Sequence, residues 1–373
     1  MRKTLLHIYL CLCFIAFPKG ILEDKETAHH LKKSLDHIYN YEFRTAEKYL
    51  EKIRAKHPHS PVYNLVEAIK MNLEYPELVA DESDLYKRFH QHIKTTILWS
   101  ERDLKVNPED FEAIFFKLTA LSLTGLKFSQ AKQYSKAMNI AKTAYEYAKK
   151  AMKYKTQFHE FYFTSGLYNY YVVQFPESHP IIKPFMVFFQ DGNKALGLTE
   201  LQYTTQHTTF SVPEAYNFLS NIYFKYENNY EKAYDYALIL FHKYPKNSFF
   251  QYKLCEIALM KGELKTAKAC LDSIKTNKTH FYKAAHEILW AYYLERANGS
   301  NAKIKQLYTD GLAITTKYKL NSLELKCIAY MGLARTHHRD KNIPEAKNYY
   351  KLAIESTPNN YYQKEASEYL KNH

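Results

Sequence analysis

The sequence predicts an all-α fold in which paired helices stack into a solenoid. Only 9 of the 373 residues are glycine, about a third of the usual share of about 7%. So few glycines argue against β-sandwiches and propellers, which need many tight turns. The hydrophobic content of 46% and the charged content of 24% are those of a folded globular chain rather than a disordered one. Small and apolar residues also recur with a period of 34 residues, which is the length of a repeated helix pair.

Residues 1–20 predict a secretory signal peptide. Two basic residues precede the apolar run 5–17, and Pro18-Lys19-Gly20 follows it, which is the order of features in such a signal. The run is shorter than the roughly 20 apolar residues of a membrane span. Gly20 suits the position just before a cleavage site, whereas proline is a poor residue at position 18, two positions earlier. We expect an extracytoplasmic location, in the periplasm or cell envelope. Soluble release is favoured over lipid anchoring, because each cysteine of the run follows a leucine where a small residue is required.

The net charge of the whole chain is +13. A basic surface attracts polyanions such as nucleic acid, acidic lipids and acidic glycans. Here the basic residues are spread along the predicted helices and do not form one run. An exported protein also seldom meets nucleic acid, so we expect no nucleic-acid partner.

The repeat is defined by four positions on one helix and in the turn after it. An alanine is followed by a large or small apolar residue four positions later, by another apolar residue three positions further, and by proline after five more. The alanine allows two helices to approach closely, and the proline ends the helix. The pattern begins at Ala46, Ala233, Ala267 and Ala346, and only the third copy lacks the proline.

These features resemble the tetratricopeptide repeat (TPR) superfamily, whose 34-residue unit is a helix–turn–helix. Segments 230–234 and 342–346 are typical of the entry to its second helix, and Gly262-Glu263-Leu264 matches the turn between its two helices. The resemblance implies a right-handed α-solenoid of about eight TPR-like units, some of them elongated. The units are regular at 27–60, 214–247, 248–281 and 327–360, and stretched at 61–110, 111–158, 159–213 and 282–326. The predicted organisation is thus an N-terminal set at 27–213, a regular C-terminal set at 214–360 and a capping segment at 361–373.

Most of the additional length predicts longer helices, at Asp84–Val106 and Ser129–Tyr154. The exception is an apolar insert at 174–190, interrupted by Pro176, Pro180 and Pro184. Asp191-Gly192 then opens a new helix. A Gly-aromatic helix at 166–171, this insert and Gly197-Leu198 occur in the order found in the tetratricopeptide-repeat protein 39 family and its bacterial relatives. The segment from Ala215 to Asn247 also resembles that family, which has no established chemistry to transfer.

No motif for catalysis, cofactor or metal is present, so we expect a protein that is not an enzyme. Gly192 and Gly197 have the spacing of a phosphate loop, but Leu198-Thr199 stands where Lys-Ser/Thr is required. Close packing of Gly197 against another helix explains that residue better. Histidine pairs such as His90 and His92 are two apart and point to different sides of a helix, which is unsuited to a metal.

Outside the signal the chain has three cysteines, at 255, 270 and 327. Their odd number, wide spacing and helical context predict small buried apolar residues rather than a disulfide framework. A single bridge between Cys255 and Cys270 remains an alternative in an oxidising compartment.

The leading functional hypothesis is a scaffold that binds a protein or peptide partner in a concave groove. The resemblance implies that the first helices of the units line this groove, and aromatic and arginine side chains are common anchors for partners. The alternative for each aromatic residue is an ordinary place in the core. The predicted groove residues are Phe163, Tyr170, Tyr171, Phe218, Tyr226, Phe249, Tyr252, Arg335, His338 and Arg339.

The insert carries a second hypothesis. Its apolar side chains are suited to shallow contact with a membrane surface or to an apolar ligand, unless the insert packs back onto the solenoid. Glycan binding through stacked aromatic rings is a third alternative. The insert residues concerned are Ile181, Ile182, Phe185, Met186, Phe188 and Phe189.

Overall fold

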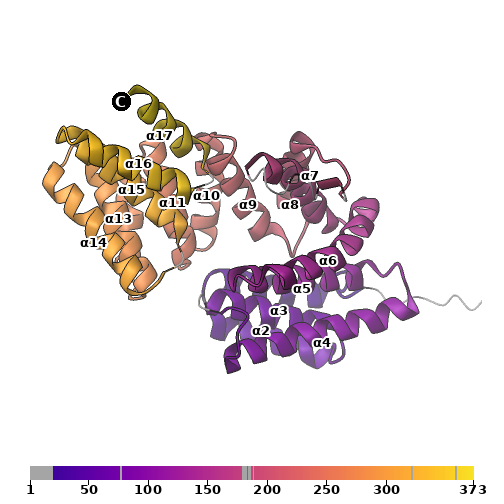
Figure 1. The fold of residues 1–373 in the computed structure, drawn as a ribbon. Helices are drawn as coiled ribbons and strands as arrows, with labels where there is room; N and C mark the ends of the chain where they lie inside the picture. The colour runs from indigo at the N-terminus through magenta and orange to yellow at the C-terminus, as the bar shows by residue number, and fades with distance from the viewer. Residues whose placement is uncertain are drawn as a thin grey trace, which may run out of the picture.

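The computed structural model describes residues 20–75, 78–178, 183, 186–187, 189–320, 322–357 and 359–373. Within these residues the chain forms seventeen α-helices and no β-strand, so the predicted all-α solenoid is confirmed (Figure 1). The helices are α1 (Lys25–Tyr39), α2 (Phe43–Lys56), α3 (Pro61–Glu74), α4 (Asp84–Val106), α5 (Phe111–Gln130), α6 (Tyr134–Tyr154), α7 (Phe161–Ser178), α8 (Lys194–His207), α9 (Val212–Lys225), α10 (Tyr230–Lys243), α11 (Ser248–Lys261), α12 (Leu264–Ile274), α13 (His280–Arg296), α14 (Asn301–Lys317), α15 (Leu323–Arg339), α16 (Ile343–Ser356) and α17 (Asn360–Asn372).

Each odd-numbered helix from α1 to α15 packs against the helix that follows it, which gives eight helix pairs. Odd-numbered helices also contact the next odd-numbered helix, as in α1–α3, α3–α5, α11–α13 and α13–α15. This is the arrangement of TPR-like units. The last helix, α17, has no partner helix of its own and packs on α16. None of the described helices has the length and apolar character needed to cross a membrane.

Local sequence signals set the helix ends. The Ser60 side chain accepts a hydrogen bond from the Val62 amide before Pro61 starts α3. The Asn247 side chain likewise accepts from the first amides of α11. Gly262 ends α11 with φ +91°, a left-handed conformation that glycine adopts without strain. These caps place the turn between α11 and α12 where the TPR resemblance predicts it.

Gly166 on α7 and Gly197 on α8 mark the closest approach between two helices. A Cβ on Gly197 would lie 2.7 Å from the Gly166 carbonyl oxygen and 2.7 Å from the Tyr170 nitrogen. No larger residue fits there without moving backbone. The interpretation of Gly197 as a packing residue is therefore confirmed.

Two boundary predictions are corrected. The predicted helix Asp84–Val106 is observed as α4, but a single helix over 129–154 is wrong. Helix α5 runs to Gln130, Lys132 adopts φ +58° and α6 begins only at Tyr134. The predicted start of the insert at residue 174 is also wrong, because α7 continues to Ser178. Pro176 lies in its last turn, where it removes only a bond near the helix end.

Several predicted residues lie outside the described part of the chain. They include the signal segment up to residue 19, Ile181, Ile182, Phe185 and Phe188 of the insert, and the repeat proline at 358. Met186 and Phe189 of the insert are described.

The chain curls back on itself, so that its first unit contacts the fifth. The side-chain amide of Asn247 donates to the Tyr39 carbonyl at 2.7 Å, and the Tyr244 hydroxyl donates to Asp36 at 3.0 Å. Lys246 pairs with Glu42 at 2.6 Å. Figure 1 shows α2–α6 as one lobe and α10–α17 as another, with α7–α9 between them. The contacts from α1 to the α10–α11 turn therefore tie the two lobes together.

Candidate partner-binding groove

Five of the predicted groove residues gather on α7 and α9. The Phe163 and Phe218 ring centres are 5.8 Å apart, and those of Tyr171 and Phe218 are 6.1 Å apart, both edge to face. Tyr171 also meets Tyr226, the C-cap residue of α9, at 6.3 Å. Edge-to-face rings at such distances attract one another. We call Phe163, Tyr170, Tyr171, Phe218 and Tyr226 the aromatic cluster.

Tyr170 is the buried member of this cluster. Its side chain is 0% exposed, and its hydroxyl donates to Glu227 at 2.5 Å. Burial and the Glu227 carboxylate both raise the pKa of Tyr170 well above its usual range. The prediction that Tyr170 faces a partner is therefore wrong, because its apolar body is needed in the core. The other four side chains are half-buried.

Tyr252 is a second correction. It is 1% exposed, and its ring packs against Phe281 at 5.4 Å and Phe249 at 6.5 Å between ring centres. Burial raises the pKa of its hydroxyl, which has no hydrogen-bond partner among the described residues. Tyr252 is therefore a core residue, while Phe249 is half-buried at its edge.

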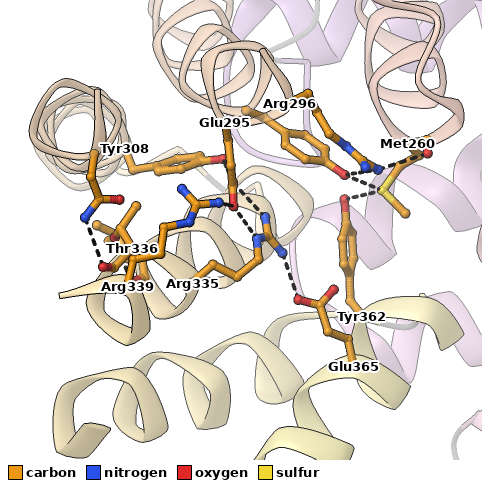
Figure 2. A network of polar contacts seen from close by, with 12 residues as sticks. Met260, Glu295, Arg296, Tyr308, Arg335, Thr336, Arg339, Tyr362 and Glu365 are labelled. Carbon is orange, nitrogen blue, oxygen red and sulfur yellow. Dashed lines mark hydrogen bonds and ion pairs between the residues drawn. The ribbon is translucent and has the colours of Figure 1, made fainter. Parts of the chain in front are cut away.

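Two of the basic groove residues, Arg335 and Arg339, form an ionic network around the buried Glu295. Figure 2 shows Arg335 and Arg339 of α15 converging on Glu295 of α13. Arg335 Nε lies 2.6 Å from Glu295 Oε1, and Arg339 Nη2 lies 2.9 Å from the same oxygen. Tyr308 donates a further hydrogen bond to Glu295 at 3.0 Å. Burial opposes ionisation of Glu295, but the two guanidinium groups outweigh it and lower its pKa.

The C-terminal helix occupies the face on which the groove was predicted. Glu365 of α17 accepts from Arg335 at 3.0 Å (Figure 2). Tyr369 Oη lies 2.9 Å from His338 Nδ1. Tyr362 donates to the Met260 sulfur of α11 at 3.3 Å. Asn360 donates to the Tyr226 carbonyl at 3.0 Å. Arg335 and His338 therefore both contact α17, although His338 stays exposed.

The sequence predicted only a capping segment at 361–373. A signal for its actual place was available in the spacing of Tyr362, Glu365 and Tyr369, three and four residues apart. Such spacing puts the three side chains on one helical side, opposite the basic residues of α15. What the sequence could not show is that α9, α11 and α15 end close enough to meet one helix.

A second ionic group joins the same three helices, and the sequence analysis missed it. Lys253 of α11 lies 2.9 Å from Glu324 of α15 and 3.2 Å from Glu256. Lys225 of α9 also pairs with Glu324. Burial lowers the pKa of Lys253, but the two carboxylates outweigh it, so the pKa is raised. These ion pairs connect α9, α11 and α15 and so fix the distances between these three helices.

The described residues hold no candidate metal site and no disulfide. No group of three or more His, Cys, Asp or Glu side chains within them is placed to hold a metal ion. Cys255, Cys270 and Cys327 are buried free thiols, and burial raises the pKa of each. The alternative Cys255–Cys270 bridge is not formed in this structure.

The described end of the insert packs on its neighbours. The Phe189 ring lies 4.9 Å from Tyr145 of α6 between ring centres, edge to face. Tyr145 accepts from the Gln190 amide at 3.1 Å, and Tyr168 of α7 donates to the Gln190 carbonyl at 2.7 Å. Met186 is half-buried, while Val187 is 79% exposed. This end of the insert therefore combines an attached aromatic residue with a solvent-exposed apolar one.

No protein-family model and no curated protein matches this chain. Among solved structures, the crystal structure of the yeast Tom70 is similar at 13% identity with a TM-score of 0.36, over 94% of this chain and 81% of that one. The apo form of the quorum sensor NprR from B. thuringiensis is similar at 16% identity with a TM-score of 0.40, over 90% and 99%. The fold assignment rests on the helix pairs and caps of this chain itself.

Proposed function

We propose that this protein is an exported, non-catalytic scaffold that binds a protein or peptide partner through the aromatic cluster. The observation that carries the proposal is the set of four half-buried rings shared by α7 and α9. Rings of this kind, partly exposed and already held by neighbours, anchor partners at little entropic cost. The signal-like residues 1–20 support export. The order of the 166–171 helix, the insert and Gly197-Leu198 supports kinship with the tetratricopeptide-repeat protein 39 family.

The partner site lies beside α17. The Tyr226 carbonyl receives the Asn360 side chain, so the start of α17 adjoins the aromatic cluster. The basic side chains further along are neutralised by Glu295 and Glu365. Recognition is therefore aromatic and apolar in character, and a partner segment with an aromatic or aliphatic anchor fits it best.

The test is affinity capture from the native cell envelope with a Tyr171→Ala/Phe218→Ala/Tyr226→Ala variant. Tyr170 stays unchanged because it is buried. The control is Tyr134→Ala, which removes a ring that is 65% exposed on α6. We expect the triple variant to lose the partner recovered by the wild type and the control to keep it. Undiminished recovery by a triple variant with native circular dichroism would show that the aromatic cluster is not the site.

Contact with a membrane surface through the insert is the second candidate, favoured by the exposure of Val187 and the exposed Lys183 nearby. An apolar side chain next to a cation suits an anionic lipid interface. Flotation with anionic vesicles tests it, with Val187→Asp as the variant and Val106→Asp, 83% exposed on α4, as the control. Absence of flotation by the wild type would remove this candidate.

A further inference from the structure

The carboxylate of Glu112 holds the chain at the predicted end of the signal segment. Its Oε2 accepts the Ile21 amide at 2.7 Å, and its Oε1 accepts the Leu22 amide at 2.7 Å. Glu112 stands in the first turn of α5, about 90 residues away in sequence. A Cβ at Gly20 would lie 2.5 Å from Glu112 Oε1. The carboxylate therefore packs directly against the backbone at residues 20–22.

This carboxylate has donors but no cation. Burial raises the pKa of Glu112 to about 7, against the two amides that lower it. The charged groups that act on it are Asp110, the N-cap of its own helix, and Glu23 of the N-terminal segment, and both raise the pKa further. Within the described residues no basic side chain pairs with Glu112. A half-buried carboxylate in acidic surroundings gains most from a positive charge placed between its oxygens and the solvent.

We propose that cleavage after Gly20 makes Ile21 the first residue, and that its α-ammonium then pairs with Glu112. The Gly20–Ile21 peptide bond is hydrolysed by a membrane-bound leader peptidase. Water supplies the hydroxyl of the Gly20 carboxylate and a proton to the released Ile21 amine, which takes up another proton from solvent. The nitrogen that becomes the ammonium already lies 2.7 Å from Oε2, so no rearrangement is required. The inference rests on the export part of the proposed function.

Gly20 suits the proposed cut, because a leader peptidase needs a small residue just before the bond that it cleaves. In the uncleaved chain its backbone lies against the Glu112 carboxylate. The hydrogen bonds that the Gly20 carbonyl receives from the Glu23 and Asp24 amides are lost on cleavage. Their loss is tolerated because this segment is partly exposed and water replaces the carbonyl.

Pairing changes the pH dependence of stability in a defined direction. An α-amino group ordinarily has a pKa of about 7.7–8.0, and the Glu112 carboxylate raises it in the folded state. Where Glu112 is ionised, the stabilisation is then present below pH of about 8 and disappears as the pH rises through the higher folded-state pKa of the amine. A neutral peptide amide at the same position shows no such loss.

The first test is the N-terminal sequence and intact mass of the protein recovered from the cell envelope. We expect a chain that begins at Ile21. A chain that begins at another residue overturns this inference but leaves export intact, whereas an uncleaved chain overturns export as well. Partner capture through the aromatic cluster is measured separately, so its failure is distinguishable from either result.

The second test compares residues 21–373, released from a fusion that leaves no additional residue, with the same chain extended by Gly-Ser-Gly before Gly20. Glu112→Gln is made in both, and unfolding in urea is measured from pH 6 to about pH 10. We expect the substitution to lower the folding equilibrium constant about tenfold more in the 21–373 form than in the extended form. The excess should vanish at the highest pH. Equal effects in both forms at every pH would overturn the ion pair.

Discussion

The C-terminal region at 214–360, where three of the four units are regular, and the stretched units at 61–213 use the same helix pair but bury it to different extents. Eleven of the fourteen residues of α11 are buried. In α5, the corresponding first helix of a stretched unit, ten of the twenty residues are buried. Among second helices, four of the eleven residues of α12 are buried, against one of the 21 residues of α6. The longer helices extend into solvent and leave Val106 and Tyr134 83% and 65% exposed. The helices of a 34-residue unit are thus surrounded by neighbouring helices. The additional helical turns of the stretched units enlarge the solvent-exposed surface and not the core.

Two buried charges, one in each region, are also held differently. In the C-terminal region, Glu295 joins α13 to two arginines of α15 and, through Arg335, to α17. In the stretched region, buried Lys117 pairs with one half-exposed carboxylate, Glu101, at 2.7 Å. In a shared network the contacts of several helices depend on one side chain. In an isolated ion pair, loss of one side chain removes only that pair.

The largest predicted effect breaks that network. Glu295→Ala leaves two arginines without their common partner, and we expect a loss of about 3–5 kcal/mol in the free energy of unfolding of the C-terminal region. Glu101→Ala is the matched change in the stretched region. We expect it to cost about 1 kcal/mol or less, because Glu101 is half-exposed and Lys117 keeps the Tyr147 hydroxyl at 2.6 Å. Urea unfolding followed by circular dichroism measures both, and similar losses would contradict the contrast.

A second pair of substitutions should act with opposite sign in the two regions. A Cβ at Gly332 of α15 would lie 2.1 Å from the Tyr308 ring, so Gly332→Ala overpacks the core and should cost about 1–3 kcal/mol. A Cβ at Gly125 of α5 meets nothing closer than Ile140 at 3.6 Å. Gly125→Ala should therefore stabilise by about 0.5–1 kcal/mol through helix propensity. Melting temperatures decide the matter: destabilisation by both substitutions would show that the stretched helices pack as tightly as the regular ones.

Part of this structure could be predicted from the sequence and part could not. The alanine and proline positions at 34-residue intervals predicted the helix pairs, and the close packing of Gly197 against another helix was predicted from glycine alone. The failures at Tyr170 and Tyr252 share one cause. Ring spacing along a helix is the same for a core and for a binding surface, so exposure can be known only after neighbouring helices are placed. The place of α17 depends on contacts over more than 100 residues, which no local pattern contains.

The last predicted effect concerns a buried cation that lacks a carboxylate. Lys127 of α5 is 2% exposed, and its ammonium donates to the Leu78 carbonyl at 2.9 Å. Burial lowers its pKa to about 8 from the usual 10.5, whereas burial of Arg335 is outweighed by Glu295 and its pKa rises. Between about pH 8 and pH 10 the unfolded chain therefore binds more protons at Lys127 than the folded chain does, and this site makes the protein more stable as pH rises.

Lys127→Met keeps the apolar stem of the side chain and removes the charge. We expect the wild type to gain roughly 1–2 kcal/mol relative to this variant between pH 8 and pH 10, after allowance for partial solvent access. Urea unfolding of both chains at each pH gives the difference directly, so that titration of other groups cancels. A difference that stays constant over this range would mean that Lys127 remains fully charged in the fold. The stretched region would then stabilise an isolated cation as well as the C-terminal network stabilises its arginines.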